Sequence, residues 1–145
     1  MLRKLIVPVV ALTWLAACEQ NPVPASPAPP ATPVPTISYM VFFDWASAKL
    51  TDQGVATIQE AATVFKSKQN AHVLAGGFTD TSGSPEANMA LSKRRVDAVK
   101  AELVKDGVPD SAITTTAHGE TDLLVNTGDE VKDQRNRRVV VVIQP

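Results

Sequence analysis

The chain has 145 residues, enough for one domain with a single hydrophobic core. Hydrophobic residues make up 44% and charged residues 20%, the usual balance of a soluble globular protein. The formal net charge of −1 at pH 7 argues against nucleic acid as a partner, because a broad nucleic-acid surface needs clustered positive charge.

Residues 1–17 are predicted to be a signal peptide. "MLRK" supplies two positive charges, and residues 5–17 form an apolar run that only Pro8 and Thr13 interrupt. The run is short for a membrane-spanning helix, which needs roughly 20 residues, but typical of a signal-peptide core. Its end, "LAAC", resembles the lipobox of bacterial lipoproteins, in which the cysteine is acylated and the chain is cut before it. Cys18 is the single cysteine, so the alternative is a secreted protein with an incidental free thiol.

Residues 18–37 are predicted to be the lipidated cysteine and a proline-rich tether. Seven of the 11 prolines lie within residues 21–36, and such a segment lacks the backbone donors for a sheet and the apolar side chains for a core. In a polyproline conformation of about 3.1 Å per residue, it reaches on the order of 50 Å. The alternative is a ligand for a proline-binding module.

Residues 38–145 are predicted to be the folded domain. Thr51 and Ser84 are expected to cap the starts of two helices, Pro85 suits the first turn of the second, and Gly107 suits its left-handed end. The order β-α-β-α-β-β predicts an α+β fold, a two-layer sandwich with the helices packed on a mixed four-stranded sheet. The expected strands are 38–45, 71–78, 112–119 and 137–144, and the expected helices are 50–67 and 84–105.

The second helix carries two neighbouring stripes at helical spacing. The first is apolar and is expected to face the sheet: Met89, Val96, Val99 and Leu103. The second stripe is mixed: Asn88, Leu91, Ser92 and Arg95. Arg95 is expected at a partly shielded position beside the core, whereas Arg94 is expected to point away and to be solvated.

The glycine-rich loop that joins the second strand to this helix holds Thr79 and Asp80. Because strand, loop and returning helix lie side by side, the loop brings the Asp80 carboxylate near the Arg95 guanidinium. One interpretation is a simple structural ion pair between them, or an aspartate used for turn geometry. The other is a site for a zwitterion, whose ammonium binds Asp80 and whose carboxylate binds Arg95 in bidentate fashion.

Residues 77–99, "GFTDTSGSPEANMALSKRRVDAV", resemble the signature of the OmpA-like, peptidoglycan-binding domain. Further matching segments are "VFFDWASAKLT" (41–51), "HGE" (118–120) and "NRRV" (136–139), so the resemblance covers about residues 39–143. Phe78 departs from the usual His or Tyr. With the lipobox, the layout is similar to the peptidoglycan-associated lipoproteins of Gram-negative outer membranes.

The resemblance implies non-covalent binding of the meso-diaminopimelate of peptidoglycan stem peptides, which carries a free zwitterionic end. It also implies a lipid anchor in the outer membrane, on the periplasmic face, that ties this membrane to the cell wall. Asn136 and Arg138 are expected to be structural. The ligand-binding residues that the family implies are Asp80 and Arg95 as anchors, Asn88 and Leu91 beside them, and Asp44 and Thr79 holding the ligand or the loop.

No enzyme activity and no cofactor are expected. His72 and His118 are 46 residues apart and lack metal-ligand spacing, and the chain has no G-x-S-x-G motif. The alternatives are a linker that binds other envelope proteins rather than the wall and, less favoured, a cell-wall hydrolase.

Overall fold

The computed structural model describes residues 36–145. The predicted signal peptide, Cys18 and the proline-rich segment up to residue 35 lie outside the described residues. The folded domain was expected to begin at residue 38, and the first strand begins one residue earlier, at Ile37.

Four strands form one mixed sheet in the order β1-β4-β2-β3. β4 lies between β1 and β2 and is antiparallel to both, whereas β2 and β3 are parallel. The predicted fold class and element order are therefore confirmed. The strands are β1 (Ile37–Phe42), β2 (His72–Phe78), β3 (Ile113–Gly119) and β4 (Arg138–Gln144).

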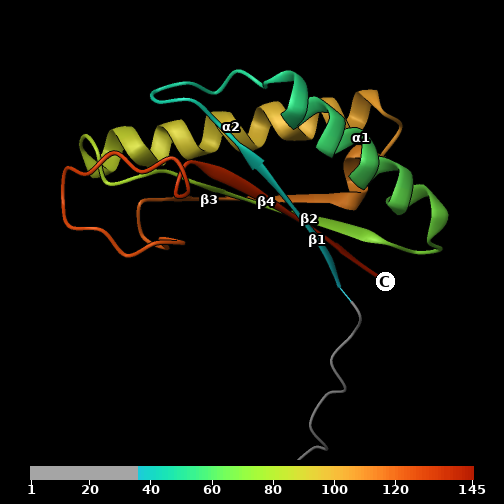
Figure 1. Ribbon diagram of the computed structural model, residues 1–145. Helices are drawn as coiled ribbons and strands as arrows, with labels where there is room; N and C mark the ends of the chain where they lie inside the picture. Colours follow the sequence, from blue (N-terminus) through green and yellow to red (C-terminus); the bar gives the residue numbers. More distant parts are fainter. Residues whose placement is uncertain (1–35) are drawn as a thin grey trace, which may run out of the picture. The chain divides into compact units, whose positions relative to one another are not determined.

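Both helices, α1 (Asp52–Ser67) and α2 (Pro85–Lys105), lie on the same face of the sheet, as Figure 1 shows. A short 3₁₀ helix, η1 (Asp110–Ala112), leads into β3. The predicted helix ends are confirmed. The side chains of Thr51 and Ser84 each accept a hydrogen bond from a backbone N–H of the first turn, and Gly107 has the positive φ of 94°.

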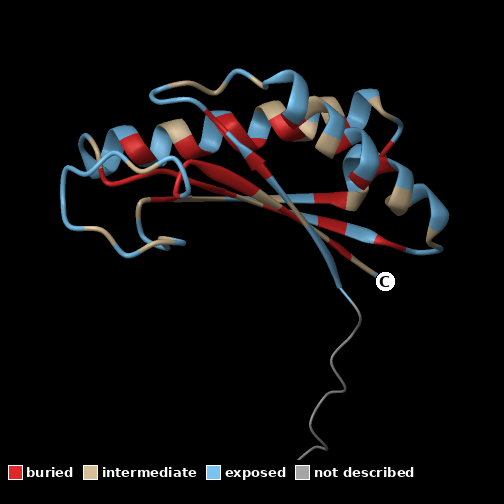
Figure 2. Cartoon of the chain, viewed as in Figure 1, coloured by how far each residue is buried: buried red, intermediate tan, exposed pale blue. Residues whose placement is uncertain are grey.

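The core lies between this face of the sheet and the two helices (Figure 2). Alternate residues of each strand point toward the helices, so every second residue of β4 is a buried apolar side chain. The main contributors are Val41, Phe43, Val73, Val139, Val141 and Ile143 from the sheet side, and Ile58, Ala61, Val96, Val99 and Leu103 from the helices.

A glycine in β2 sets how closely α2 approaches the sheet. A Cβ on Gly77 would lie 2.5 Å from the carbonyl oxygen of Ser92, a distance that packed atoms do not reach. Ser92 also accepts a hydrogen bond on its Oγ from the backbone N–H of Gly119, at 3.0 Å. These contacts fix the N-terminal half of α2 over the ends of β2 and β3.

The apolar stripe predicted for α2 is right in its C-terminal half and wrong at Met89. Val96, Val99 and Leu103 are buried, but Met89 is 43% exposed. The N-terminal half of α2 buries its polar stripe instead, which turns Met89 away from the core, toward a shallow surface depression beside Ala117. No helix within residues 36–145 is both long and apolar enough to cross a membrane.

Candidate ligand-binding site

A pocket of about 190 Å³ lies where the loop after β2 faces α2 and the loop after β1. Three of the residues predicted for the site line it: Asp80, Asn88 and Leu91. The other lining residues are Trp45, Ala46, Ser82, Ala87 and Arg94. The structure therefore brings together three of the six predicted site residues. It adds Trp45 and Arg94, which were not predicted.

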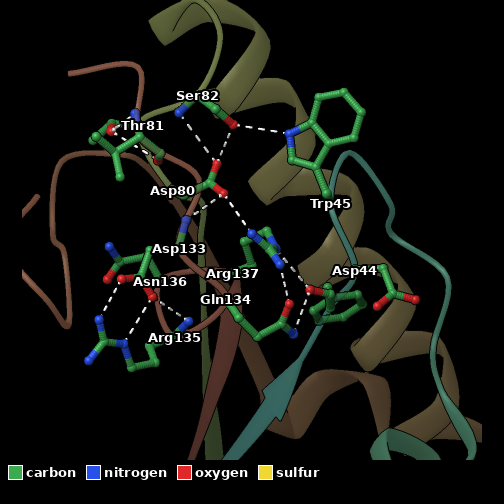
Figure 3. Close-up of polar contacts among 12 residues, drawn as sticks. Asp44, Trp45, Asp80, Thr81, Ser82, Asp133, Gln134, Arg135, Asn136 and Arg137 are labelled. Carbon is green, nitrogen blue, oxygen red and sulfur yellow. Dashed lines mark hydrogen bonds and ion pairs between the residues drawn. The ribbon is translucent and has the colours of Figure 1, made fainter. Parts of the chain in front are cut away.

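Asp80 is the most densely bonded residue of the site and is only 3% exposed. Its Oδ1 accepts a hydrogen bond from the Ser82 hydroxyl at 2.7 Å. Its Oδ2 accepts from Nη1 of Arg137 at 2.9 Å and from the backbone N–H of Asp133 at 3.2 Å, as Figure 3 shows. The structural ion pair between Asp80 and Arg95 that the sequence allowed does not form, because Asp80 pairs with Arg137 instead.

Arg95 is wholly buried, with 0% of its surface exposed. The partly shielded position expected from the helical stripes is therefore wrong. Arg95 shares the helix face that turns inward, and each of its nitrogens donates to a backbone carbonyl. The bonds are Nε to Ser47 (2.8 Å), Nη1 to Phe78 (3.0 Å) and Nη2 to Asp44 (3.0 Å). Arg95 thus holds the loop after β1 against the end of β2.

Arg95 keeps its positive charge although its side chain is covered. The pKa of Arg95 is lowered to about 10, mainly because the side chain is buried. The nearby Asp80 raises this pKa, and the like charges of Arg137 and Arg94 lower it. Arg95 is therefore still cationic at neutral pH.

Trp45 forms the wall opposite α2 and is 55% exposed. Its indole Nε1–H donates to Ser82 Oγ at 3.1 Å, so the Ser82 hydroxyl accepts from the indole and donates to Asp80 (Figure 3). The ammonium of Lys132 lies 3.7 Å from the centre of the Trp45 ring. The sequence placed Trp45 at the end of a strand, and nothing in its local pattern indicated a pocket wall.

The α2 wall consists of Asn88, Leu91 and Arg94. Asn88 is buried, and its Nδ2 donates to a carboxylate oxygen of Glu120 at 2.5 Å. Arg94 is exposed, as expected. It lines the pocket together with Asp80 and Asn88, which corrects its expected place on the helix.

Asp44 and Thr79, both predicted to hold the ligand or the loop, do not line the pocket. Figure 3 shows the Asp44 side chain pointing away from Asp80, and its carbonyl oxygen is what Arg95 binds. The backbone N–H of Thr79 donates to the carbonyl of Gly119 at 2.8 Å. Its buried hydroxyl has no partner among the described residues.

The segment before β4 closes over the loop after β2. Thr81 Oγ1 donates to the carbonyl of Gly128 at 2.8 Å and accepts from the N–H of Val131 at 3.1 Å. A side-chain hydrogen bond from Arg135 is the main reason that the pKa of Asp133 is lowered to about 2. These bonds fix the backbone that donates to Asp80.

Asn136 and Arg138 were expected to have structural roles, and both contact other parts of the folded domain. Asn136 is fully buried and bonds both the N–H and the carbonyl of Val125, each at 2.9 Å. The Arg138 guanidinium lies 4.0 Å from the centre of the Phe78 ring, and His118 stacks on the same ring at 4.7 Å. Within residues 36–145, no three His, Cys, Asp or Glu side chains gather as they would around a metal ion.

The chain is similar to proteins of the bacterial envelope. It is 39% identical over 117 residues to an outer membrane protein of Gluconacetobacter diazotrophicus, an alignment that covers 77% of this chain and 31% of the relative. It is 36% identical over 101 residues to the peptidoglycan-associated lipoprotein of Haemophilus influenzae, covering 70% and 66%. The chain thus spans about a third and about two thirds of the length of these two curated relatives.

A solved structure is also similar to this chain in fold and sequence. The crystal structure of the peptidoglycan-associated lipoprotein from Burkholderia pseudomallei has a TM-score of 0.67 and 34% sequence identity, covering 72% of this chain and 89% of that one. Residues 42–137 match the OmpA family, which is more than half of the chain. The pocket, the loop that carries Asp80 and both walls lie within the matched range. The chain belongs to the OmpA family.

Proposed function

We propose that this protein binds peptidoglycan non-covalently in the cell envelope, through the meso-diaminopimelate of stem peptides. Family membership and the relatives named peptidoglycan-associated lipoprotein support the binding of the wall. The observation that carries the finer proposal is the pocket itself, whose lining includes the buried Asp80 and the exposed Arg94. A ligand that carries an ammonium and a carboxylate on one carbon complements both charges.

In this proposal Asp80 receives the ammonium. Its Oδ2 is held by Arg137 and by the Asp133 backbone, whereas its Oδ1 is held by Ser82, whose hydroxyl can rotate. An ammonium that replaces the hydroxyl at Oδ1 keeps the carboxylate bonded and makes a charge-assisted contact. The Ser82 hydroxyl still has the indole of Trp45 as its donor.

The remaining site residues shape the pocket around this contact. Leu91 offers an apolar surface to the methylene groups of diaminopimelate, and Asn88 offers its amide oxygen. Because Arg95 is covered, we propose that it attracts the carboxylate through its buried charge and positions the loops of Asp44 and Thr79 through their backbones, rather than touching the ligand.

The direct test is sedimentation with purified sacculi. Asp80→Asn keeps the shape of the side chain and removes its charge, so bound protein should fall at least tenfold, since a charged hydrogen bond contributes about 1.5–3 kcal/mol. Asp97→Asn is the matched control, because Asp97 lies on the exposed side of α2, bonded to Lys93, outside the pocket. Equal sedimentation of the two variants would contradict the site.

We further propose that the protein is anchored in the outer membrane by a lipid on Cys18. The support is the sequence of residues 1–18, which lies outside the described residues. Each buried methylene of an acyl chain contributes about 0.8 kcal/mol to membrane binding. Cys18→Ser should therefore move the protein to the soluble fraction in wall-free preparations, and a variant that stays wholly with the membranes would contradict the anchor.

Binding is proposed to be the whole activity toward the wall. Incubation of sacculi with the purified protein should release no muropeptides, and release would instead support the hydrolase alternative. Sedimentation with sacculi stripped of other proteins separates wall binding from the alternative of a linker between envelope proteins, which would not sediment under these conditions.

A further inference from the structure

The sheet has two faces, and only one of them is covered by helices. Among residues 36–145, α1 and α2 both pack on the face that holds the core, and Figure 1 shows no helix on the other face. Because side chains alternate along a strand, this open face consists of the outward positions between the buried ones. We infer that two copies of this chain pack against each other through their open faces. This interface is separate from the pocket at Asp80 and independent of its ligand.

The open face is apolar at its centre and carries almost no charge. Its exposed apolar side chains are Met40, Phe42 and Leu74, and Val140 and Val142 lie half-buried between them. No aspartate, glutamate or lysine occupies an outward position of β1, β2, β3 or β4. An exposed apolar patch of this kind marks an interaction site, and the lack of charge favours a partner surface that is uncharged as well.

A hollow of about 280 Å³ lies on this face, at Gly76 of β2. Gly76 has no side chain to fill it, and the stacked rings of Phe78 and His118 form one wall. A Cβ on Gly76 would lie 3.3 Å from the Phe78 ring and 3.4 Å from Nε2 of His118, so the hollow opens directly above the glycine. It is larger than the cavity of about 150 Å³ that holds a benzene ring, so an apolar side chain fits into it.

A side chain that fits the hollow lies on the same face, two strands away. Met40 of β1 is opposite Val140 of β4, and Val140 is opposite Gly76 of β2. Met40 and Gly76 therefore lie in one row across the sheet, about 10 Å apart, because neighbouring strands are about 4.8 Å apart. Met40 is 42% exposed, and an unbranched methionine adapts to irregular gaps.

A two-fold axis along β4 places each Met40 over Gly76 of the other copy. This rotation keeps every row at the same height along the strands and exchanges the two sides of β4. β1 of one copy then lies over β2 of the other, and Val140 faces Val140 of the second copy. The two contacts form together, because such an interface uses the same patch on both subunits. Strands of two sheets that pack face to face run in nearly the same direction, as this axis requires.

The arginine on this face does not oppose the pairing. Arg138 is buried, its guanidinium lies on the Phe78 ring, and its Nη2 donates to the carbonyl of Asp122 at 3.3 Å. Each copy therefore covers its own Arg138, and the segment that carries Asp122 bounds the patch at this end.

The size of the face predicts a weak dimer. Four strands of six or seven residues cover roughly 400 Å² of flat area, and more once side chains are counted. Two such faces bury about the 1,000 Å² of a transient interface rather than the about 1,600 Å² of a stable one. The dimer is therefore expected at high local concentration. The lipid anchor proposed for Cys18 supplies such a concentration, because it confines the copies to one surface.

Sedimentation velocity of the full-length protein in density-matched detergent, over a range of concentrations, tests the interface. Met40→Lys replaces the inserted side chain, and Thr116→Glu places a carboxylate at the rim of the hollow; both positions are exposed, so the fold should be kept. Each variant should raise the dimer dissociation constant at least tenfold. An equal mixture of the two should dimerise more tightly than either alone, because one Met40–Gly76 contact is then intact and the other pairs Lys with Glu. Met89→Lys, at a residue that is 43% exposed on α2, is the matched control and should behave as wild type.

Photo-methionine, which replaces Met40 and Met89 alike, locates the contact by mass spectrometry. In a mixture of ¹⁵N-labelled and unlabelled chains, crosslinks between copies should join Met40 to residues around Gly76, and Met89 should give only background. Crosslinks between copies from Met89 alone, or equal dimerisation of wild type, Met40→Lys and Thr116→Glu, would overturn the interface.

A wild type that stays monomeric at every concentration would also overturn the interface. Protection of the open face from hydrogen exchange in that monomer would assign the face to residues 1–35 of the same chain. Met40→Lys should sediment with sacculi as wild type does, because Met40 lies outside the pocket at Asp80. The failure of the dimer and the failure of wall binding are therefore distinguishable.

Discussion

Both halves of α2 bury side chains, but the C-terminal half buries them against apolar side chains and the N-terminal half against polar backbone groups. The C-terminal half places Val96, Val99 and Leu103 against the apolar face of the sheet. The N-terminal half places Ser92 and Arg95 among backbone groups of the loops and strand ends. One helix therefore contributes to an ordinary core at one end and to a polar scaffold at the other.

The difference matters because the two environments respond differently to substitution. An apolar core loses stability in proportion to the volume removed, and its neighbours partly relax. In a polar scaffold, a substitution that removes a donor leaves its buried acceptors without a hydrogen bond. Each buried carbonyl without a donor costs about 1–3 kcal/mol. The pocket is built on the second kind of support, so its geometry depends on particular residues rather than on packed volume.

The largest effect is expected for Arg95→Met, which keeps much of the side-chain volume but strands the carbonyls of Asp44, Ser47 and Phe78. Removal of the buried charge offsets part of this cost. We expect a loss of about 4 kcal/mol in the free energy of unfolding, measured by urea denaturation. Arg94→Met, one residue earlier and exposed, should change stability by less than about 0.5 kcal/mol. Equal losses would show that the two arginines do not differ.

A somewhat smaller loss is expected at the other end of the helix. Leu103→Ala removes a fully buried side chain from the apolar half and should cost about 3 kcal/mol. Because the pocket lies at the far end of α2, binding of wall peptide by the folded variant should be unchanged in calorimetry. A large loss of affinity in folded Leu103→Ala would mean that the two halves are coupled.

The smallest change in stability is expected for the residue that caps the start of α2. Ser84 accepts from the N–H of Ala87 at 3.2 Å and caps α2 next to the pocket. Ser84→Ala should cost about 1 kcal/mol of stability. Ser84→Asp keeps a capping oxygen and should restore that loss, and failure to restore it would mean that the cap contributes little here.

Much of the fold could be predicted because its signals are local. Strand alternation, the capping residues Thr51 and Ser84, and the glycine after α2 each act within a few residues of chain. Met89 was misplaced for the opposite reason. The apolar period of the helix carries no information about where the sheet beneath it ends and where the loops begin.

The site was predicted in part. Asp80, Asn88 and Leu91 lie in one signature and reach one pocket. The partner of Asp80 could not be found in this way, because Arg137 lies 57 residues later and meets it through the pairing of β4 with β2. Trp45 and Arg94 were missed because each has an ordinary local role, at a strand end and on an exposed helix face. Only the tertiary arrangement places both in the lining of the pocket that holds Asp80.

The central claim is that wall peptide binds in the pocket at Asp80. Trp45 is the only tryptophan within residues 36–145, and its indole Nε1–H is bonded to Ser82 at the pocket wall. Titration of ¹⁵N-labelled protein with a diaminopimelate-containing stem peptide should therefore shift the Trp45 indole resonance and the amides of Ser82 and Asn88. Amides of the opposite sheet face, such as Leu74 and Val142, should stay in place. Shifts confined to that sheet face, with the Trp45 indole unmoved, would contradict the account.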